Sequence, residues 1–210
     1  MEAALLVNVV QKCVYAKSLR KARQLHALLV TTGSNLNPLP FLGNNLLSIY
    51  SKCGSLEEAR QVFDQMPQRN PVSYNALIAG YSRNPHHAFL SLQLLPAMAI
   101  ENLRPNGSTF TSLLQACSCL EDEREGAKLH AQVIKLGFFF DVYVQTSLLG
   151  MYSSCGDLDS ANRVFGEMEQ KDDVAWNSVI FENLKHDRIE DSLQLFCTMM
   201  RTELPSQSVF

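Results

Sequence analysis

The sequence lacks the features that would place it in a membrane or divide it into linked domains. It has no run of about 18 apolar residues, so no transmembrane helix is expected. It also has no segment rich in proline, serine or glycine that would act as a flexible linker. Charged residues are scarce, at 19% of 210 residues, and the formal net charge is −3. This balance argues against strong nonspecific binding to nucleic acid, because proteins that bind mainly phosphate are usually basic.

Signatures of catalysis and of metal binding are also missing. There is no H-x-E motif with a downstream C-x-x-C, no G-x-S-x-G turn and no glycine-rich phosphate loop. Cys117 and Cys119 form a C-x-C pair, but no second pair stands at zinc-binding spacing. We therefore expect no enzymatic activity, no metal site and no cofactor.

What the sequence does contain is a repetition of itself. The segment FLGNNLLSIYSKCGSLEEARQVFDQM (residues 41–66) returns 102 residues later as YVQTSLLGMYSSCGDLDSANRVFGEM. VSYNALI returns at the same offset as VAWNSVI, and VVQKC with RQLHALLVTTG returns at an offset of 104 as LLQAC with AKLHAQVIKLG. Three different units repeated in one order predict a stacked array rather than one globular core.

Each unit has the length of two helices and their turns. Apolar residues recur at three- and four-residue spacing, which is typical of amphipathic helices. Gly54 is expected to end a first helix in the left-handed conformation. Ser55 to Glu58 reads as a capping box that opens a second helix, and Asp187 is expected to begin another cap of this kind. No segment alternates with period two, so we predict an all-α fold of helical hairpins.

Four of the cysteines repeat with the units, which favours structural roles. Cys53 and Cys155 hold the same turn position, and Cys13 and Cys117 hold the same helix position. We expect small, buried thiols in a reducing compartment.

The histidines receive a similar interpretation. His26 and His130 correspond to each other on second helices and are expected to pack between repeats. His86 and His87 stand at an expected turn and are predicted to be solvated.

These repeated segments resemble the pentatricopeptide-repeat family, in particular the plant type that alternates P, L and S repeats. VSYNALIAGY and VAWNSVI are similar to P repeats, LLQAC with KLHAQVIKLG to L repeats, and LLSIYSKCGSLEEARQVFDQMPQRN to S repeats. The resemblance implies a right-handed α-solenoid, and we expect this chain to lack the C-terminal editing extension that such plant proteins carry. It divides the chain into repeats L 3–39, S 40–70, P 71–106, L 107–141, S 142–172 and P 173–206, with 207–210 starting another.

The resemblance also implies single-stranded RNA as the ligand, with one base for each repeat. The fifth and the last residue of a repeat would read the base. The pairs are Asn44 with Asn70, Asn75 with Asn106, Thr111 with Asp141, Thr146 with Asp172, and Asn177 with Ser206; Val7 and Leu39 hold these positions in the first L repeat. By the family pattern Asn/Asn reads C or U, Thr/Asp reads G and Asn/Ser reads C. The alternative for each residue is a cap or turn, where Asn and Asp are common.

Two supporting roles follow from the same resemblance. The second residue of a repeat would wedge against neighbouring bases. It is apolar or aromatic in four repeats, as Phe41, Val72, Tyr143 and Val174, whereas the second L repeat departs from this pattern with Ser108. A basic residue late in the first helix would approach phosphate; Lys52, Arg83 and Lys185 hold that position. The alternatives are packing between repeats for the aromatic residues and a solvated surface charge for the cations.

One P repeat departs from the family pattern. Pro96 stands inside its expected second helix, where proline would kink the chain at a cost of about 3 kcal/mol. We therefore expect this repeat to be distorted and its Asn75/Asn106 pair to read a base less reliably.

The favoured function is sequence-specific binding of single-stranded RNA, in organellar RNA processing or C-to-U editing with catalysis supplied in trans by a deaminase or other editing factor. The alternative is a helical scaffold for proteins, or a truncated remnant without function. A mitochondrion or chloroplast is expected from the family, although no transit peptide is visible. The chain ends inside a repeat, so we expect a fragment, and end-to-end association through uncapped repeats.

Overall fold

The computed structural model describes residues 18–31 and 40–203, and this part of the chain contains eleven helices and no strand. Cys13, Val7, Leu39 and Ser206 lie outside the described residues. The helices are α2 (Leu19–Thr31), α3 (Pro40–Lys52), α4 (Leu56–Gln65), α5 (Pro71–Tyr81), α6 (Ala88–Ile100), α7 (Gly107–Leu120), α8 (Glu123–Lys135), α9 (Val142–Cys155), α10 (Leu158–Glu167), α11 (Asp173–Lys185) and α12 (Ile189–Glu203). The contacts divide the chain into unit 1, residues 1–116, and unit 2, residues 117–210, with the boundary inside α7.

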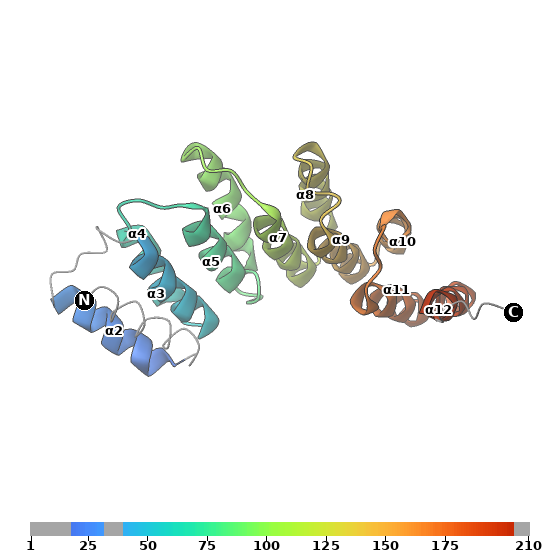
Figure 1. Ribbon diagram of the computed structural model, residues 1–210, viewed down its shortest axis with the longest axis horizontal. Coiled ribbons are helices and arrows are strands. Elements are labelled where there is room, and N and C mark those ends of the chain that lie inside the picture. Colours follow the sequence, from blue (N-terminus) through green and yellow to red (C-terminus); the bar gives the residue numbers. More distant parts are fainter. Residues whose placement is uncertain (1–17, 32–39, 204–210) are drawn as a thin grey trace, which may run out of the picture. The chain divides into compact units, whose positions relative to one another are not determined.

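Unit 1 is built from antiparallel helix pairs. Helix α3 packs against α2, α4 and α5, while α5 packs against α4 and α6 (Figure 1). The first helices α3 and α5 therefore lie side by side, and each carries its second helix. Leu46 and Ile49 of α3 and Leu77 and Ile78 of α5 are completely buried and form the centre of this unit.

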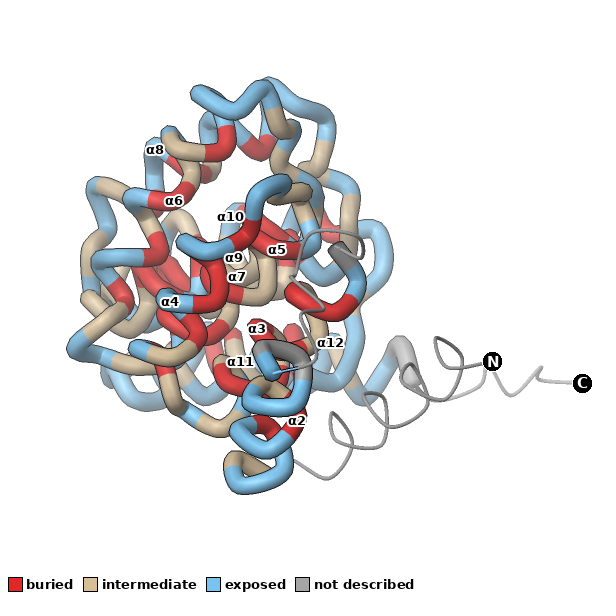
Figure 2. The backbone as a smooth tube through the Cα atoms, turned by 90° about the vertical axis from the view of Figure 1, so that its left-hand side faces the viewer, coloured by how far each residue is buried: buried red, intermediate tan, exposed pale blue. Residues whose placement is uncertain are grey.

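Unit 2 repeats the same arrangement. Helix α9 packs against α8, α10 and α11, and α11 packs against α10 and α12. Its core contains Leu148, Leu149 and Met151 of α9 with Val179 of α11. Figure 2 shows how buried and exposed positions alternate along the helices, as their amphipathic sequences predict.

Left-handed residues close the turns inside the hairpins. Gly54 has φ of 75°, which confirms the predicted left-handed cap, and Gly156 repeats this conformation with φ of 82°. Asp187 has φ of 61° and takes the equivalent left-handed position, so the prediction that it caps α12 is wrong by one residue. Arg188 instead directly precedes α12. A left-handed aspartate is tolerated because its short polar side chain can hydrogen-bond locally.

The predicted capping box at Ser55 is also wrong. Ser55 is the N-cap of α4, but its side chain accepts no hydrogen bond from the helix. Asp157 holds the equivalent place before α10 with a similar backbone conformation, and it accepts from Ser160 N at 3.0 Å. The longer aspartate side chain spans a gap that the serine hydroxyl leaves open.

Pro96 does not interrupt its helix. Helix α6 runs from Ala88 to Ile100 through this proline, so the expected disruption of the repeat is not present as a break. Pro96 is exposed, and the carbonyl that loses its N–H partner four residues earlier can be satisfied by water on that side.

Candidate functional site

Four of the predicted base-reading residues are helix N-caps. Asn70 Oδ1 accepts from Ser73 N at 3.1 Å before α5, and Asn106 Oδ1 accepts from Thr109 N at 3.1 Å before α7. Asp141 and Asp172 accept from the first-turn backbone N–H groups of α9 and α11. The capping role that the sequence left open is therefore present. A cap uses one oxygen of each side chain and leaves the second polar atom for another partner.

A first cluster of polar side chains joins α3 to α5. Asn44 Nδ2 lies 3.4 Å from Asn70 Oδ1, and Ser73 Oγ lies 2.6 Å from Asn44 Oδ1. Asn70 Nδ2 makes no hydrogen bond within the described residues. The structure thus brings the fifth and the last residue of this predicted repeat together and leaves an amide donor unused.

A second cluster repeats this geometry between α5 and α7. Asn75 Nδ2 donates to Asn106 Oδ1 at 3.0 Å, and Thr109 Oγ1 lies 2.7 Å from Asn75 Oδ1. Ser108 adds a contact that the first cluster lacks, because its hydroxyl lies 3.1 Å from Asn75 Nδ2 and 2.9 Å from Asn106 Oδ1. Ser108 therefore accepts the second Nδ2 proton of Asn75, whereas the second Nδ2 proton of Asn44 has no acceptor within the described residues.

The threonine pairs are arranged differently. Thr146 Oγ1 donates to Val142 O at 2.9 Å and Thr111 Oγ1 to Ser108 O at 3.0 Å, so both hydroxyls turn to their own helices. No hydrogen bond joins Thr146 to Asp172 in the described part of the chain. Asn177 is exposed and makes no side-chain hydrogen bond with any described residue.

Sequence reasoning missed Ser73 and Thr109. Each is the third residue after an asparagine, in the strings NPVS and NGST, and each completes a capping box with that asparagine. The three-residue spacing is a signal for the cap. It gives no sign that the hydroxyl also reaches an asparagine about 30 residues earlier in the chain.

The residues predicted to wedge against bases project into solvent. Phe41 is 38% exposed, Val72 and Val174 are each 59% exposed, and Tyr143 is 80% exposed. An apolar surface of this size is left available for stacking, and the exposure of Tyr143 is too large for a residue that packs between repeats.

The predicted phosphate-binding cations are also on the surface. Lys52 and Arg83 are exposed and form no ion pair within the described residues. Lys185 pairs with Glu182 at 3.3 Å, which compensates part of its charge. A ligand phosphate would have to compete with that carboxylate, although an exposed pair of this kind is weak.

A groove in unit 2 lies between α9 and α11. It encloses about 600 Å³, and Gly150, Ser154, Asn177 and Phe181 are among its lining residues. Asn177 therefore faces an open hollow, next to an exposed aromatic ring that could contact a flat ligand.

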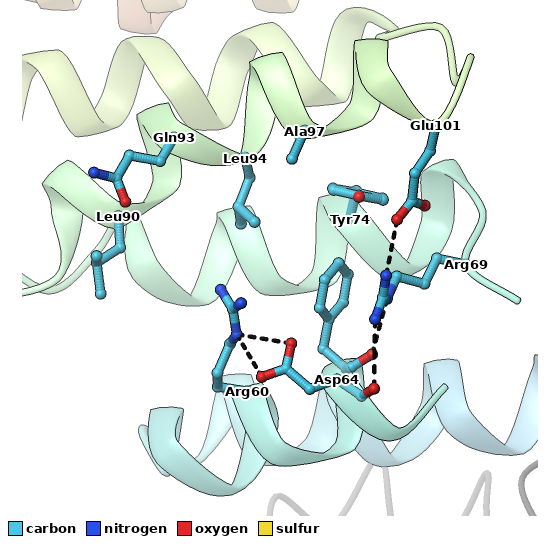
Figure 3. Close-up of a pocket in the computed structure, with 10 residues that line it drawn as sticks. Arg60, Asp64, Arg69, Tyr74, Leu90, Gln93, Leu94, Ala97 and Glu101 are labelled. Carbon is cyan, nitrogen blue, oxygen red and sulfur yellow. Dashed lines mark hydrogen bonds and ion pairs between the residues drawn. The ribbon is translucent and has the colours of Figure 1, made fainter. Parts of the chain in front are cut away.

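A second kind of cavity involves the second helices and recurs in both units. In unit 1 it encloses about 350 Å³ between α4, α5 and α6 (Figure 3). Arg69 spans it, with Nε donating to Phe63 O at 3.0 Å and Nη1 to Glu101 at 2.8 Å. Arg60, which also lines the cavity, pairs with Asp64. Because both arginines are already paired, we interpret the cavity as part of the packing between the hairpins.

The corresponding cavity of unit 2 encloses about 400 Å³ between α10, α11 and α12. There Lys171 donates to Met168 O and lies 5.2 Å from the centre of the Phe165 ring, as Arg69 lies over Phe63. The buried aromatic pair is Phe165 with Trp176. In both units, therefore, a cation between two hairpins donates to a backbone carbonyl at the C-terminal end of the preceding helix, α4 for Arg69 and α10 for Lys171.

His26 and His130 pack as predicted. Their Nδ1 atoms lie 3.1 Å from Tyr50 Oη and 2.9 Å from Tyr152 Oη, with edge-to-face rings. Burial lowers the pKa of both histidines. The prediction of solvation holds for His86, which is exposed, but it is wrong for His87, because His87 is half-buried and stacks on Tyr81.

The two histidine–tyrosine pairs predict a loss of stability in acid. Because the folded-state pKa values lie below the ordinary 6.5, the unfolded chain binds protons first as the pH falls. Stability is therefore complete above about pH 6.5 and decreases below it. Thermal unfolding between pH 8 and pH 5 should show a smaller acid loss in the His26→Gln/His130→Gln variant than in the wild type. Parallel curves for the two proteins would contradict this assignment.

Two of the described cysteines, Cys117 and Cys155, are poor nucleophiles. Burial raises the pKa of Cys117 to about 12 and that of Cys155 to about 11, with added repulsion from nearby carboxylates. The expectation of buried thiols holds for Cys117, but Cys53 and Cys155 are only half-buried and Cys197 is exposed. No group of three metal-ligating side chains gathers in the part of the chain that the structure describes. The helices described there include none that is long and apolar enough to span a bilayer.

Family models match large parts of the chain. The PPR repeat model matches residues 44–71, 72–84 and 174–202, and the pentatricopeptide repeat domain model matches residues 128–173. A chloroplastic pentatricopeptide repeat-containing protein of Arabidopsis thaliana is 35% identical over 90% of this chain, which covers 23% of that protein. A mitochondrial one from the same plant is 36% identical over 86% of this chain, which covers 24% of that protein. The chain thus spans about a quarter of the length of these relatives.

Solved structures show the same fold. The pentatricopeptide repeat protein PPR10 from maize matches with a TM-score of 0.73 at 23% identity, over 98% of this chain and 30% of that protein. The PPR domain of protein-only RNase P 1 from Arabidopsis thaliana, solved with tRNA, matches with a TM-score of 0.60 at 18% identity, over 77% of this chain and 90% of that chain. These matches confirm the predicted all-α fold of repeated hairpins. With the repeat models covering more than half of its residues, the chain belongs to the pentatricopeptide-repeat family.

Proposed function

We propose that this chain is a sequence-specific binding module for single-stranded RNA, with one base contacted by each repeat. The observation that carries the proposal is the pair of matching clusters around Asn44 and Asn75. Each holds two amides side by side at the start of a first helix. Exposed Phe41 and Val72 stand three residues before these asparagines on the same helices, within reach of a neighbouring base.

Relatives support RNA as the ligand class. PPR10 has been solved in complex with an 18-nt psaJ RNA element, and the RNase P 1 domain with tRNA. The repeat boundaries of the P, L and S pattern predict a site N-Y-Y-(G/N)-G-C, read 5′ to 3′ along the chain. With about 1–3 kcal/mol for each stacked base and four or five working repeats, we expect micromolar affinity.

The cellular role that we propose is organellar RNA processing or C-to-U editing. Relatives named as chloroplastic and mitochondrial support an organelle. Catalysis would come from a deaminase or another editing factor in trans. The plant P, L and S subfamily is part of this proposal.

A contact between copies of the chain is proposed as well. Leu193, Phe196 and Met200 of α12 are exposed and follow one another at three- and four-residue spacing, as on a helix face that packs against a neighbour. This stripe also supports the second candidate function, a scaffold for proteins. Loss of concentration-dependent association in a Leu193→Glu variant would support self-association.

The deciding experiment is fluorescence anisotropy with short RNAs at about 0.15 M salt, where phosphate contacts alone are weakened. UCCGGC should bind several-fold more tightly than a shuffled RNA of the same composition. Asn177→Ala and Thr146→Ala should reduce this preference, while Gln132→Ala, an exposed amide on α8, should leave it unchanged. A folded protein that binds neither RNA would reject the proposal in favour of the scaffold.

A further inference from the structure

Two buried hydroxyls hold the asparagine clusters in one orientation. Ser73 and Thr109 are completely buried, and each is the third residue of the helix that follows a cap asparagine. Ser73 Oγ lies 2.6 Å from Asn44 Oδ1 and 3.2 Å from Asn70 Oδ1. Thr109 Oγ1 has the same two kinds of contact, at 2.7 Å and 3.0 Å.

Counting protons shows which way the amides face. A hydroxyl has one proton, and Ser73 Oγ already accepts from Asn70 N at 3.2 Å. The proton therefore goes to the nearer acceptor, Asn44 Oδ1. The oxygen of Asn44 is thereby bound toward the protein, and the oxygen of Asn70 is bound by the N–H of Ser73. What the first pair can still offer a ligand is N–H groups of both amides. The second pair offers those of Asn106, because Asn75 Nδ2 already donates to Asn106 Oδ1 and Ser108 Oγ.

We propose that Ser73 and Thr109 are positioning residues that make the two asparagine pairs read cytosine in preference to uracil; this inference rests on the proposed function. Cytosine presents two adjacent acceptors, N3 and O2, toward such donors. Uracil carries a proton on N3, which would face another N–H and leave a donor unpaired. The pyrimidine positions two and three of the proposed site therefore become C-C.

The threonine pair gives an internal contrast. The third residue of α11 is Ala175, which has no hydroxyl, and here Thr146 donates to its own helix instead of meeting Asp172. Asp172 keeps its cap without help from a hydroxyl, through Ala175 N at 2.8 Å. The hydroxyl is therefore dispensable for capping, and its contact with the preceding repeat is a separate function.

The test uses the full chain with the RNAs UCCGGC and UUUGGC. The wild type should prefer UCCGGC by about 100-fold, because two cytosines are replaced and each replacement leaves one hydrogen bond unmade, which is worth about tenfold. In the Ser73→Ala/Thr109→Val variant the two affinities should converge, because the amide oxygens of Asn44 and Asn75 lose the hydroxyls that fix their orientation. The conservative variant Ser73→Thr should keep the preference. Preference for UCCGGC over UCCGAC, which is read by Thr146 and Asp172, should remain in every variant.

The outcomes separate this inference from the function beneath it. A purely structural role for the hydroxyls would weaken binding of both RNAs equally and lower the melting temperature, with the C-to-U ratio unchanged; that result overturns the inference. A wild type that binds RNA but does not distinguish UCCGGC from UUUGGC also overturns it and leaves RNA binding intact. A folded wild type that binds no RNA overturns both proposals.

Discussion

Replacing Trp176 by alanine is expected to lower the free energy of unfolding of unit 2 by about 3–5 kcal/mol. This side chain is 5% exposed, and its ring meets Phe165 edge to face at 4.7 Å between centres. Lys171 lies over the other ring of the pair, so a cavity at this point loosens the junction of α10 and α11. Urea denaturation followed by far-ultraviolet circular dichroism measures the loss.

An aromatic residue on the same helix provides the control. Phe181 of α11 is 64% exposed, and its replacement by alanine should change stability by no more than about 0.5 kcal/mol. Equal losses for Trp176→Ala and Phe181→Ala would show that the junction does not depend on the buried pair.

The second large effect is a change of base preference by Asp172→Asn. Asp172 Oδ1 caps α11, and Oδ2 makes no hydrogen bond within the described residues, so an acceptor is presented. Guanine offers N–H donors on its pairing edge, while adenine offers an acceptor at N1. Asparagine caps as well as aspartate does, so the fold is retained while the free group becomes a donor. Preference for UCCGGC over UCCGAC should fall by about tenfold or reverse, as measured by anisotropy.

The neighbouring residue Asp173 provides the control for the loss of a negative charge. Asp173→Asn removes the same charge one position along α11, away from the cap oxygen. If both variants strengthen binding of both RNAs equally, repulsion of phosphate rather than base reading explains the effect, and Asp172 has no role in specificity.

The periodicity of apolar residues was sufficient to predict the helical hairpins, because the buried face of a helix depends only on local spacing. Leu46 and Leu148 recur on equivalent helices and are both completely buried, and Gly54 takes the predicted left-handed turn. Errors arose where a short side chain had to reach a particular atom. Ser55 does not reach its helix, and Asp187 takes the turn instead of the cap.

The candidate site was accessible from sequence only in part. The pairs Asn44/Asn70 and Asn75/Asn106, proposed from family resemblance, lie within hydrogen-bond distance, and their role in reading bases stays a prediction. The hydroxyl of Ser73 was missed because its contact with Asn44 spans 29 residues. Such a contact depends on how two helices pack, which helical periodicity does not encode.

The capping role of the residues that we propose to read bases limits how such an array can be reprogrammed. Asn70, Asn106, Asp141 and Asp172 each cap the N-terminus of a helix with one side-chain oxygen, while the other polar atom makes no hydrogen bond within the described residues. Only side chains that cap helices can therefore stand at this position without a loss of stability of about 1 kcal/mol. Few residue types are therefore available at these positions for a new target sequence. Replacement by alanine or valine should destabilise the helix and also remove the proposed base contact. A designer who wants a wider choice of residues has to strengthen the helix elsewhere first.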